Sequence, residues 1–275
     1  MFKMYDLNMK EIKFPEGLMP LDIFVGSIAK ERATETIEGR SGIVDYGTNY
    51  VDRPVELSMW INSSDTTDYR LLRNELYALF DTDNAFYIEE TRVPSRVLKV
   101  AVDESFIPDR LTIRNASVDV TCRTLDSVFW ESKYTTLELH DSGYSATAEK
   151  YGLVDNIDDE KVQYRFTSNN FTVYNAGNVT VEPESMMLNI NVNVVQSDNN
   201  FTIRNITTGE EVILKRESKG SHFRIRGMVI SLGSITNIFR DTNRRFISLV
   251  PGDNQFEILN GTFEEIRFEF KFLYK

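Results

Sequence analysis

The chain has 275 residues, of which 41% are hydrophobic and 27% are charged, and its formal net charge at pH 7 is −11. This length and composition are typical of a globular protein with one large or two medium domains. No run of eighteen apolar residues is present, so we expect no membrane-spanning helix. No basic run of the kind that grips nucleic-acid phosphates is present either.

The N-terminus lacks a charged segment followed by an apolar one, so we expect no secretory signal. Cys122 is the single cysteine and cannot form an internal disulfide. Its place in an alternating segment predicts a small core residue rather than a nucleophile. The lack of disulfides fits synthesis in a reducing cytoplasm.

The first 53 residues divide into two parts. Residues 1–30 alternate loosely between apolar and polar side chains, which predicts short strands. Residues 31–53 are polar and interrupted by Gly39, Gly42 and Gly47. We interpret this segment as an extended hairpin arm that projects from the body, because an isolated hairpin is marginal unless it packs on something else. A flexible surface loop is the alternative.

The stretch from Val55 to Ile88 predicts a strand, a capped helix and a second strand. The strand alternates with a period of two, and Ser64 or Asp65 can cap the helix that follows. Four residues at helical spacing predict a buried stripe on a helix at about residues 66–80. They are Tyr69, Leu72, Leu76 and Phe80.

The rest of the first half continues with strands at 97–102 and 111–123, the second with Ile113 on its apolar face. Polar, threonine-rich sequence then predicts a domain boundary near residue 133, so that 1–133 and 134–275 form two domains. The first domain is predicted to be sandwich-like and mainly β, with one helix and the arm.

The second half is predicted to be β throughout, after a polar linker at 144–159. Regularly spaced short strands indicate a β-sandwich. The expected strands lie at 162–166, 171–174, 187–195, 201–206, 211–215, 223–225, 228–232, 245–249, 255–259 and 264–274. No stretch of this half shows a convincing helical period.

The sequence contains no recognised catalytic motif. Ser221 and His222 are neighbours on a predicted strand, where their side chains point to opposite faces. The acidic cluster Asp155, Asp158, Asp159 and Glu160 lacks the glycine and the twelfth-position glutamate of a calcium-binding loop. We therefore predict no enzyme, no cofactor and no metal site.

Several segments together resemble the distal tail proteins of phages with long non-contractile tails. In the first half they are residues 39–42, 45–47, 53, 68–72, 76–80, 86–88 and 98–102. In the second half they are residues 175–177, 181–183, 205–209 and 249–254, which resemble that family's galectin-like, carbohydrate-binding-module-like sandwich.

The resemblance implies a structural tail-tip protein of the virion, which forms a homohexameric ring through its N-terminal domain. The implied partners are the tail tube, the tip protein and possibly receptor-binding or other baseplate proteins, and DNA would pass through the channel. The arm would contact a neighbouring subunit, with candidate interface residues Gly39, Arg40, Gly42, Asp45, Tyr46, Gly47 and Arg53. The alternative is a carbohydrate-binding adhesion module that recognises host glycans.

Overall fold

The computed structural model describes residues 1–81, 84–153, 157–235 and 237–275, which fold into two compact units. The N-terminal unit is Met1–Trp130 and the C-terminal unit is Glu131–Lys275. Both are built mainly from antiparallel strands, so the predicted mainly β class is confirmed. No helix in the described part of the chain is long and apolar enough to cross a membrane.

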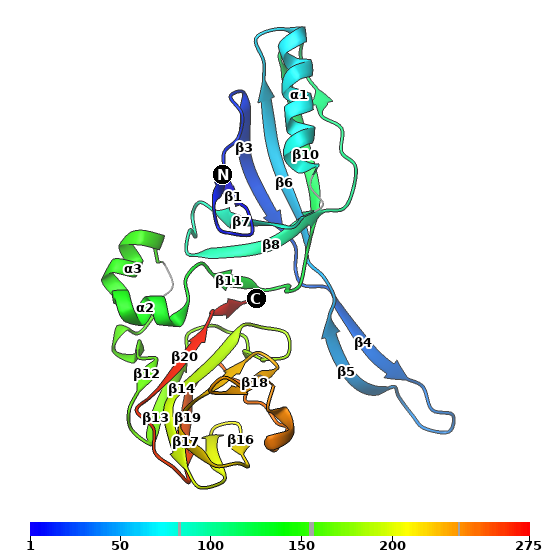
Figure 1. Ribbon diagram of the computed structural model, residues 1–275. Helices are drawn as coiled ribbons and strands as arrows, with labels where there is room; N and C mark the ends of the chain where they lie inside the picture. Colours follow the sequence, from blue (N-terminus) through cyan, green and yellow to red (C-terminus); the bar gives the residue numbers. More distant parts are fainter. Residues whose placement is uncertain (82–83, 154–156, 236) are drawn as a thin grey trace. The chain divides into compact units, whose positions relative to one another are not determined.

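The N-terminal unit contains one main sheet with strand order β2-β1-β7-β8-β10-β6-β3, while β9 pairs with β10. A separate hairpin, β4–β5, extends away from this sheet, as Figure 1 shows. The elements are β1 (Phe2–Tyr5), β2 (Glu11–Ile12), β3 (Leu18–Val25), β4 (Lys30–Glu35), β5 (Val44–Tyr50), β6 (Pro54–Asn62), α1 (Thr66–Phe80), β7 (Phe86–Glu90), β8 (Arg96–Val102), β9 (Asp109–Arg110) and β10 (Asn115–Thr124).

Helix α1 covers one face of this sheet, and the predicted stripe forms its contact with the core. The Asp65 carboxylate caps the helix by accepting hydrogen bonds from the backbone N–H groups of Thr67 and Asp68. Asp68, in the first turn, accepts from the Ser64 N–H, and this bond lowers the pKa of its carboxyl group. The predicted helix and its buried stripe are confirmed.

The long strand expected at 111–123 begins later, at Asn115. Thr112 forms a turn instead, because its hydroxyl accepts hydrogen bonds from the N–H groups of Arg114 and Asn115. Ile113 is 67% exposed, so its predicted place on the buried face is wrong. Cys122 is fully buried as expected, and burial raises the pKa of its thiol to about 12.

The C-terminal unit is a sandwich of two sheets, with strand orders β12-β20-β14-β17-β18 and β13-β19-β15-β16. The strand β11 (Trp130–Ser132) spans the division between the units. The other elements are α2 (Thr136–Ser142), α3 (Tyr144–Tyr151), η1 (Asp159–Lys161), β12 (Arg165–Phe166), β13 (Asn170–Asn175), β14 (Leu188–Ser197), β15 (Phe201–Asn205), β16 (Glu210–Leu214), β17 (Ser218–Arg226), β18 (Val229–Leu232), η2 (Phe239–Asp241), β19 (Gly252–Leu259), β20 (Glu265–Phe270) and β21 (Leu273–Tyr274).

Phenylalanine rings from both sheets fill the sandwich core. Phe268 of β20 lies 4.9 Å from Phe256 of β19 and 5.8 Å from Phe171 of β13, measured between ring centroids. A buried asparagine, Asn254, ties the second sheet to its loops. Its amide donates to the carbonyls of Val250 and Gly252, and its Oδ1 accepts from the Val250 N–H.

Two short helices, α2 and α3, occupy residues that were expected to form no helix. The Thr135 hydroxyl caps α2 by accepting from the Glu138 N–H, and Gly143 and Gly152 adopt positive φ at the helix ends. The apolar stripes are too short to produce a clear period. The prediction of an irregular linker is wrong for residues 144–151; residues 154–156 lie outside the described part.

The strand predicted at 245–249 is also absent as a regular element, and only Leu249 forms an isolated bridge, to Val181. The expected strand at 162–166 is reduced to Arg165–Phe166. The expected strand at 264–274 is divided into β20 and β21. The other strands predicted for this half are present with shifted ends.

Candidate interaction surfaces

The hairpin β4–β5 is the most exposed element of the N-terminal unit. Every residue of β4 is exposed, and in β5 only Val44 is partly covered. The two strands are antiparallel and pair from Lys30 with Tyr50 to Glu35 with Val44. Side chains of the same unit therefore bury almost none of the hairpin's surface, and both of its faces are available to another molecule.

A bulge in β5 gives the hairpin its local shape. The register shifts between Ala33 and Thr34, which leaves Tyr46 as the extra residue between Asp45 and Gly47. Gly47 adopts φ +132, and its N–H donates to the Asp45 carboxylate at 2.9 Å. The Tyr46 hydroxyl donates to Glu35 at 2.7 Å, which raises its own pKa, and the ring is 62% exposed.

The tip of the hairpin turns at Ile37–Arg40, where the Arg40 N–H donates to the Ile37 carbonyl at 3.1 Å. Gly39 and Gly42 both adopt positive φ, and a Cβ atom at either position would meet nothing within 4 Å. Ile43, beside them, is 69% exposed. Ile37 and Tyr46 are exposed as well, so this end of the hairpin carries a group of apolar side chains, which is typical of a contact with another chain.

The two faces of the hairpin carry opposite charge. Side chains alternate along β4, so Lys30 and Arg32 share one face, with Tyr50 opposite Lys30. Glu31 and Glu35 share the other face.

Arg53 holds the base of the hairpin to the sheet. Its Nε donates to the Gly26 carbonyl at 2.7 Å, and its backbone N–H donates to the Thr124 hydroxyl at 3.1 Å. Partial burial lowers the pKa of the guanidinium group. Two backbone hydrogen bonds between Ala29 and residues 51–52 also hold the base of the hairpin. Arg53 therefore positions the hairpin and lies away from its exposed tip.

Residues 8–122 match the family model of the phage tail protein RIFT-related domain. This part of the chain is therefore similar to a phage tail domain, and we use that name for residues 8–122 below. It contains the hairpin, α1 and most of the main sheet. All seven predicted interface residues lie in this domain: six on the arm and Arg53 at its base.

The crystal structure of the Dit protein (gp 19.1) of phage SPP1 is similar in fold, with a TM-score of 0.69 and 14% sequence identity over 99% of this chain and 100% of that one. Its description calls it a paradigm of the hub adsorption apparatus in phages that infect Gram-positive bacteria. Two phage p2 baseplate structures, in activated conformations with strontium and calcium, have TM-scores of 0.45 and 0.44 and a sequence identity of 10%. Both matches cover 98% of this chain and 97% of the matched chain. No curated protein matched the chain.

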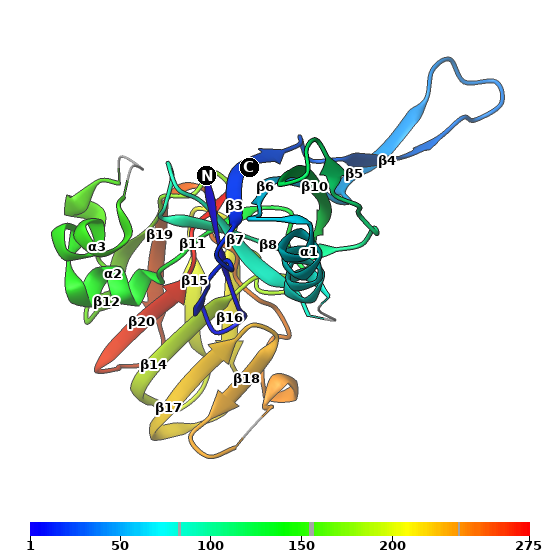
Figure 2. The ribbon, with the colours of Figure 1, turned by 90° about the horizontal axis from the view of Figure 1, so that it is seen from above.

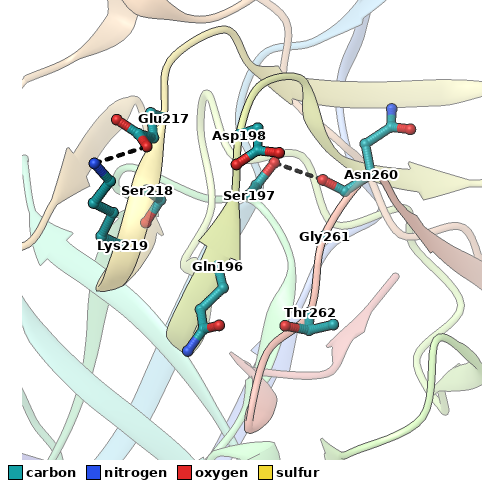
Figure 3. Close-up of a pocket in the computed structure, with 9 residues that line it drawn as sticks. All are labelled: Gln196, Ser197, Asp198, Glu217, Ser218, Lys219, Asn260, Gly261 and Thr262. Carbon is teal, nitrogen blue, oxygen red and sulfur yellow. Dashed lines mark hydrogen bonds and ion pairs between the residues drawn. The ribbon is translucent and has the colours of Figure 1, made fainter.

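Outside the phage tail domain, a polar groove of about 680 Å³ opens at one end of the sandwich. Figure 3 shows its side chains, which come from the ends of β14 and β17 and from residues 260–262. Lys219 pairs with Glu217 at 2.9 Å, and the Ser197 hydroxyl donates to the Asn260 carbonyl at 2.5 Å. The groove has no aromatic or apolar floor, so it lacks the usual character of a small-molecule site.

Asp158 of the acidic cluster has a structural role. Asp158 caps η1 by accepting from the Glu160 N–H at 3.2 Å, and Lys161 pairs with Asp253 at 2.9 Å. Asp155 lies outside the described residues. Among the residues that the structure describes, no three His, Cys, Asp or Glu side chains gather in a way that could hold a metal ion.

The sequence pattern does not predict which groups anchor the base of the hairpin, or that the two faces of the hairpin differ in charge. Gly26 was not singled out, although a Cβ atom there would lie 2.7 Å from Pro54 Cγ. The only available signal was the alternation of basic and acidic residues in 30–35, which becomes informative once β4 is known to be extended.

Proposed function

We propose that this protein is a structural component of a phage tail tip, which assembles as a closed homohexameric ring through its N-terminal unit. The phage tail domain supports this role, as does the similarity in fold to the SPP1 Dit protein, which is described as a hub. In this role the ring joins the tail tube to the tip protein. The C-terminal sandwich offers a docking surface for receptor-binding or other baseplate proteins. The protein is then a virion component made in the host cytoplasm, with no catalytic role.

The hairpin is the observation that carries the proposal. A two-stranded hairpin is marginally stable alone, and this one has exposed apolar side chains along its length. Burial on a second copy of the chain would stabilise it. In this arrangement the hairpin of one copy binds a different surface on the next copy, so each contact is head-to-tail. A series of such contacts forms a ring when the rotation between neighbouring copies brings the last copy back to the first.

The charge of the chain fits a channel for DNA. The net charge of −11 is compatible with an acidic channel lining, which would repel the phosphate backbone and let DNA slide through without being held. This agrees with a role as passive conduit, in which no DNA sequence is recognised.

The test is the oligomeric state of a chain with a shortened hairpin. Replacing residues 34–46 by Asn-Gly joins Ala33 to Gly47, which already pair with each other, through a two-residue turn. The matched control is Ile206→Ser, which removes a half-exposed isoleucine from the C-terminal unit.

Light scattering on a sizing column and negative-stain images give the outcome. We expect wild type and Ile206→Ser to form rings with a central hole at six times 31.8 kDa, and the shortened variant to be a folded monomer. Rings of the shortened variant would contradict the role of the hairpin. A wild-type chain that stays monomeric up to about millimolar concentration would contradict self-assembly and favour the carbohydrate-binding alternative.

A further inference from the structure

The outward face of the five-stranded sheet in the C-terminal unit carries an unusual set of polar side chains. Along β14, β17 and β20 the inward positions are buried and apolar, so the alternate positions face outward. The outward side chains are Asn189, Asn191 and Asn193 on β14, His222, Arg224 and Arg226 on β17, and Glu265, Arg267 and Glu269 on β20.

The strand register brings these side chains into rows. Asn191 lies between Arg267 on one side and Arg224 on the other, and Ser231 of β18 follows Arg224. Arg165 of β12 completes this row beyond Arg267. Figure 2 shows β20, β14, β17 and β18 side by side in the same order. Residues that are far apart in the sequence thus form one continuous polar surface.

On the β12 and β20 side of this surface, the charges are neutralised within the unit. Arg165 pairs with Asp141 at 2.8 Å, and Arg267 pairs with Glu265. The Asn189 amide donates to Glu269 at 3.2 Å. These groups already have partners and need no ligand.

On the β14 and β17 side, the polar groups lack partners. The side chains of Arg224 and Arg226 make no hydrogen bond or ion pair with any residue that the structure describes. Asn191 Oδ1 and His222 Nδ1 are shielded from solvent, yet neither has a hydrogen-bond partner in the described part of the chain. A buried polar atom without a partner is destabilising, so its presence requires an explanation.

The unpaired groups together define the chemistry of a ligand. The two guanidinium groups are free to bind anionic oxygens through forked pairs of N–H donors. Asn191 Oδ1 can only accept, so it needs a ligand hydroxyl or N–H group. A chain that carries both hydroxyl groups and anions satisfies both needs. A neutral glycan lacks the anion. An acidic peptide supplies carboxylates and backbone N–H donors, but these donors lie several bonds away from the anion, whereas an acidic polysaccharide carries hydroxyl donors and anions on the same rings.

We propose that the outward face of β14 and β17, centred on Asn191, His222, Arg224 and Arg226, binds an acidic polysaccharide. The two arginines bind its carboxylate or phosphate groups, and Asn191 and His222 bind its hydroxyl groups. Asn191 is the cross-strand neighbour of Arg224, so an anionic sugar bound by Arg224 would lie beside Asn191. The site lies wholly in the C-terminal unit, so it does not depend on assembly of a ring.

The test measures binding of the full chain to polymers by titration calorimetry. Alginate supplies carboxylates with hydroxyl groups, and phosphomannan supplies phosphates with hydroxyl groups. Dextran is neutral, and poly-L-glutamate has carboxylates without hydroxyl groups. We expect binding to alginate or phosphomannan, whichever anion the site prefers, no binding to dextran, and at least about tenfold weaker binding to poly-L-glutamate.

Three variants locate the site. Arg224→Gln with Arg226→Gln should weaken binding by about tenfold or more, and Asn191→Leu by about fivefold. The matched control is Arg244→Gln with Arg245→Gln, which removes the same charge from exposed positions near the other sheet and should leave binding unchanged. Thermal melts check that each variant is folded.

Three outcomes would overturn the proposal. The first is equal loss of binding in the two double-arginine variants, which would indicate general electrostatic attraction. The second is poly-L-glutamate binding as tightly as the acidic polysaccharides. The third is an absence of binding to both alginate and phosphomannan at millimolar sugar concentrations.

Discussion

Truncation of Leu76 tests whether α1 holds the phage tail domain together. Leu76 lies at the centre of the buried stripe and is fully buried against the sheet. Leu76→Ala removes three buried carbons at about 0.8 kcal/mol each, which gives about 2.5 kcal/mol before any cavity is counted. The cavity left behind raises the expected loss of unfolding free energy to about 3–5 kcal/mol. Leu76→Asp would add the cost of a buried charge and should unfold the unit.

Leu71→Ala is the matched control, because this residue lies on the opposite face of the same helix and is 57% exposed. Its expected effect is within about 0.5 kcal/mol. Trp60 lies in β6 of the N-terminal unit, whereas Trp130 begins β11 at the division between the units. Tryptophan fluorescence during urea unfolding, measured in a Trp130→Phe background, therefore reports the N-terminal unit. Equal effects of the two truncations would refute the assignment of the buried face.

Three further predictions concern other buried groups. Asn254→Ala removes an amide that bonds Val250 and Gly252, and should destabilise the C-terminal unit by about 2–4 kcal/mol in circular-dichroism melts, whereas Gln255→Ala, exposed on the same strand, should not. Gly177→Ala would place a Cβ atom 2.5 Å from the Leu273 carbonyl oxygen, so it should lower the yield of folded protein, unlike Gly209→Asn, where a Cβ meets nothing within 4 Å and asparagine tolerates the φ of +74. Because the folded pKa of Cys122 is about 12 against 9.0 for a free thiol, its stabilising contribution is complete below pH 9 and falls between pH 9 and 12. Denaturation series should show a weaker decline over this range in Cys122→Ala.

Local patterns predicted much of the N-terminal unit correctly. The cap at Asp65 and the spacing of Tyr69, Leu72, Leu76 and Phe80 were sufficient to place α1, because capping and amphipathic spacing act within a few residues. The exposed arm could be recognised from its polarity and glycines. The surface that we propose receives it on a second copy could not be predicted, since such a surface depends on contacts between copies of the chain.

The errors came where the signal was short or where distant residues decide the structure. Helix α2 has seven residues, too few for a visible stripe, although Thr135 followed by Glu138 three residues later is a recognised capping signal. Ile113 fits the alternation of a strand, but Thr112 turns the chain first. The alternation of apolar and polar residues does not show that the Thr112 hydroxyl bonds backbone N–H groups that a continued strand would use.

The polar face of the sandwich shows a different limit. Each of its strands alternates in the way that any half-exposed strand does, so Asn191, Arg224 and Arg267 read separately as ordinary surface residues. Only the register across three strands places them in one row. The hairpin and this face lie in different units, so assembly and glycan recognition can be lost independently. Shortening the hairpin should abolish rings and preserve polysaccharide binding, while Arg224→Gln with Arg226→Gln should do the reverse.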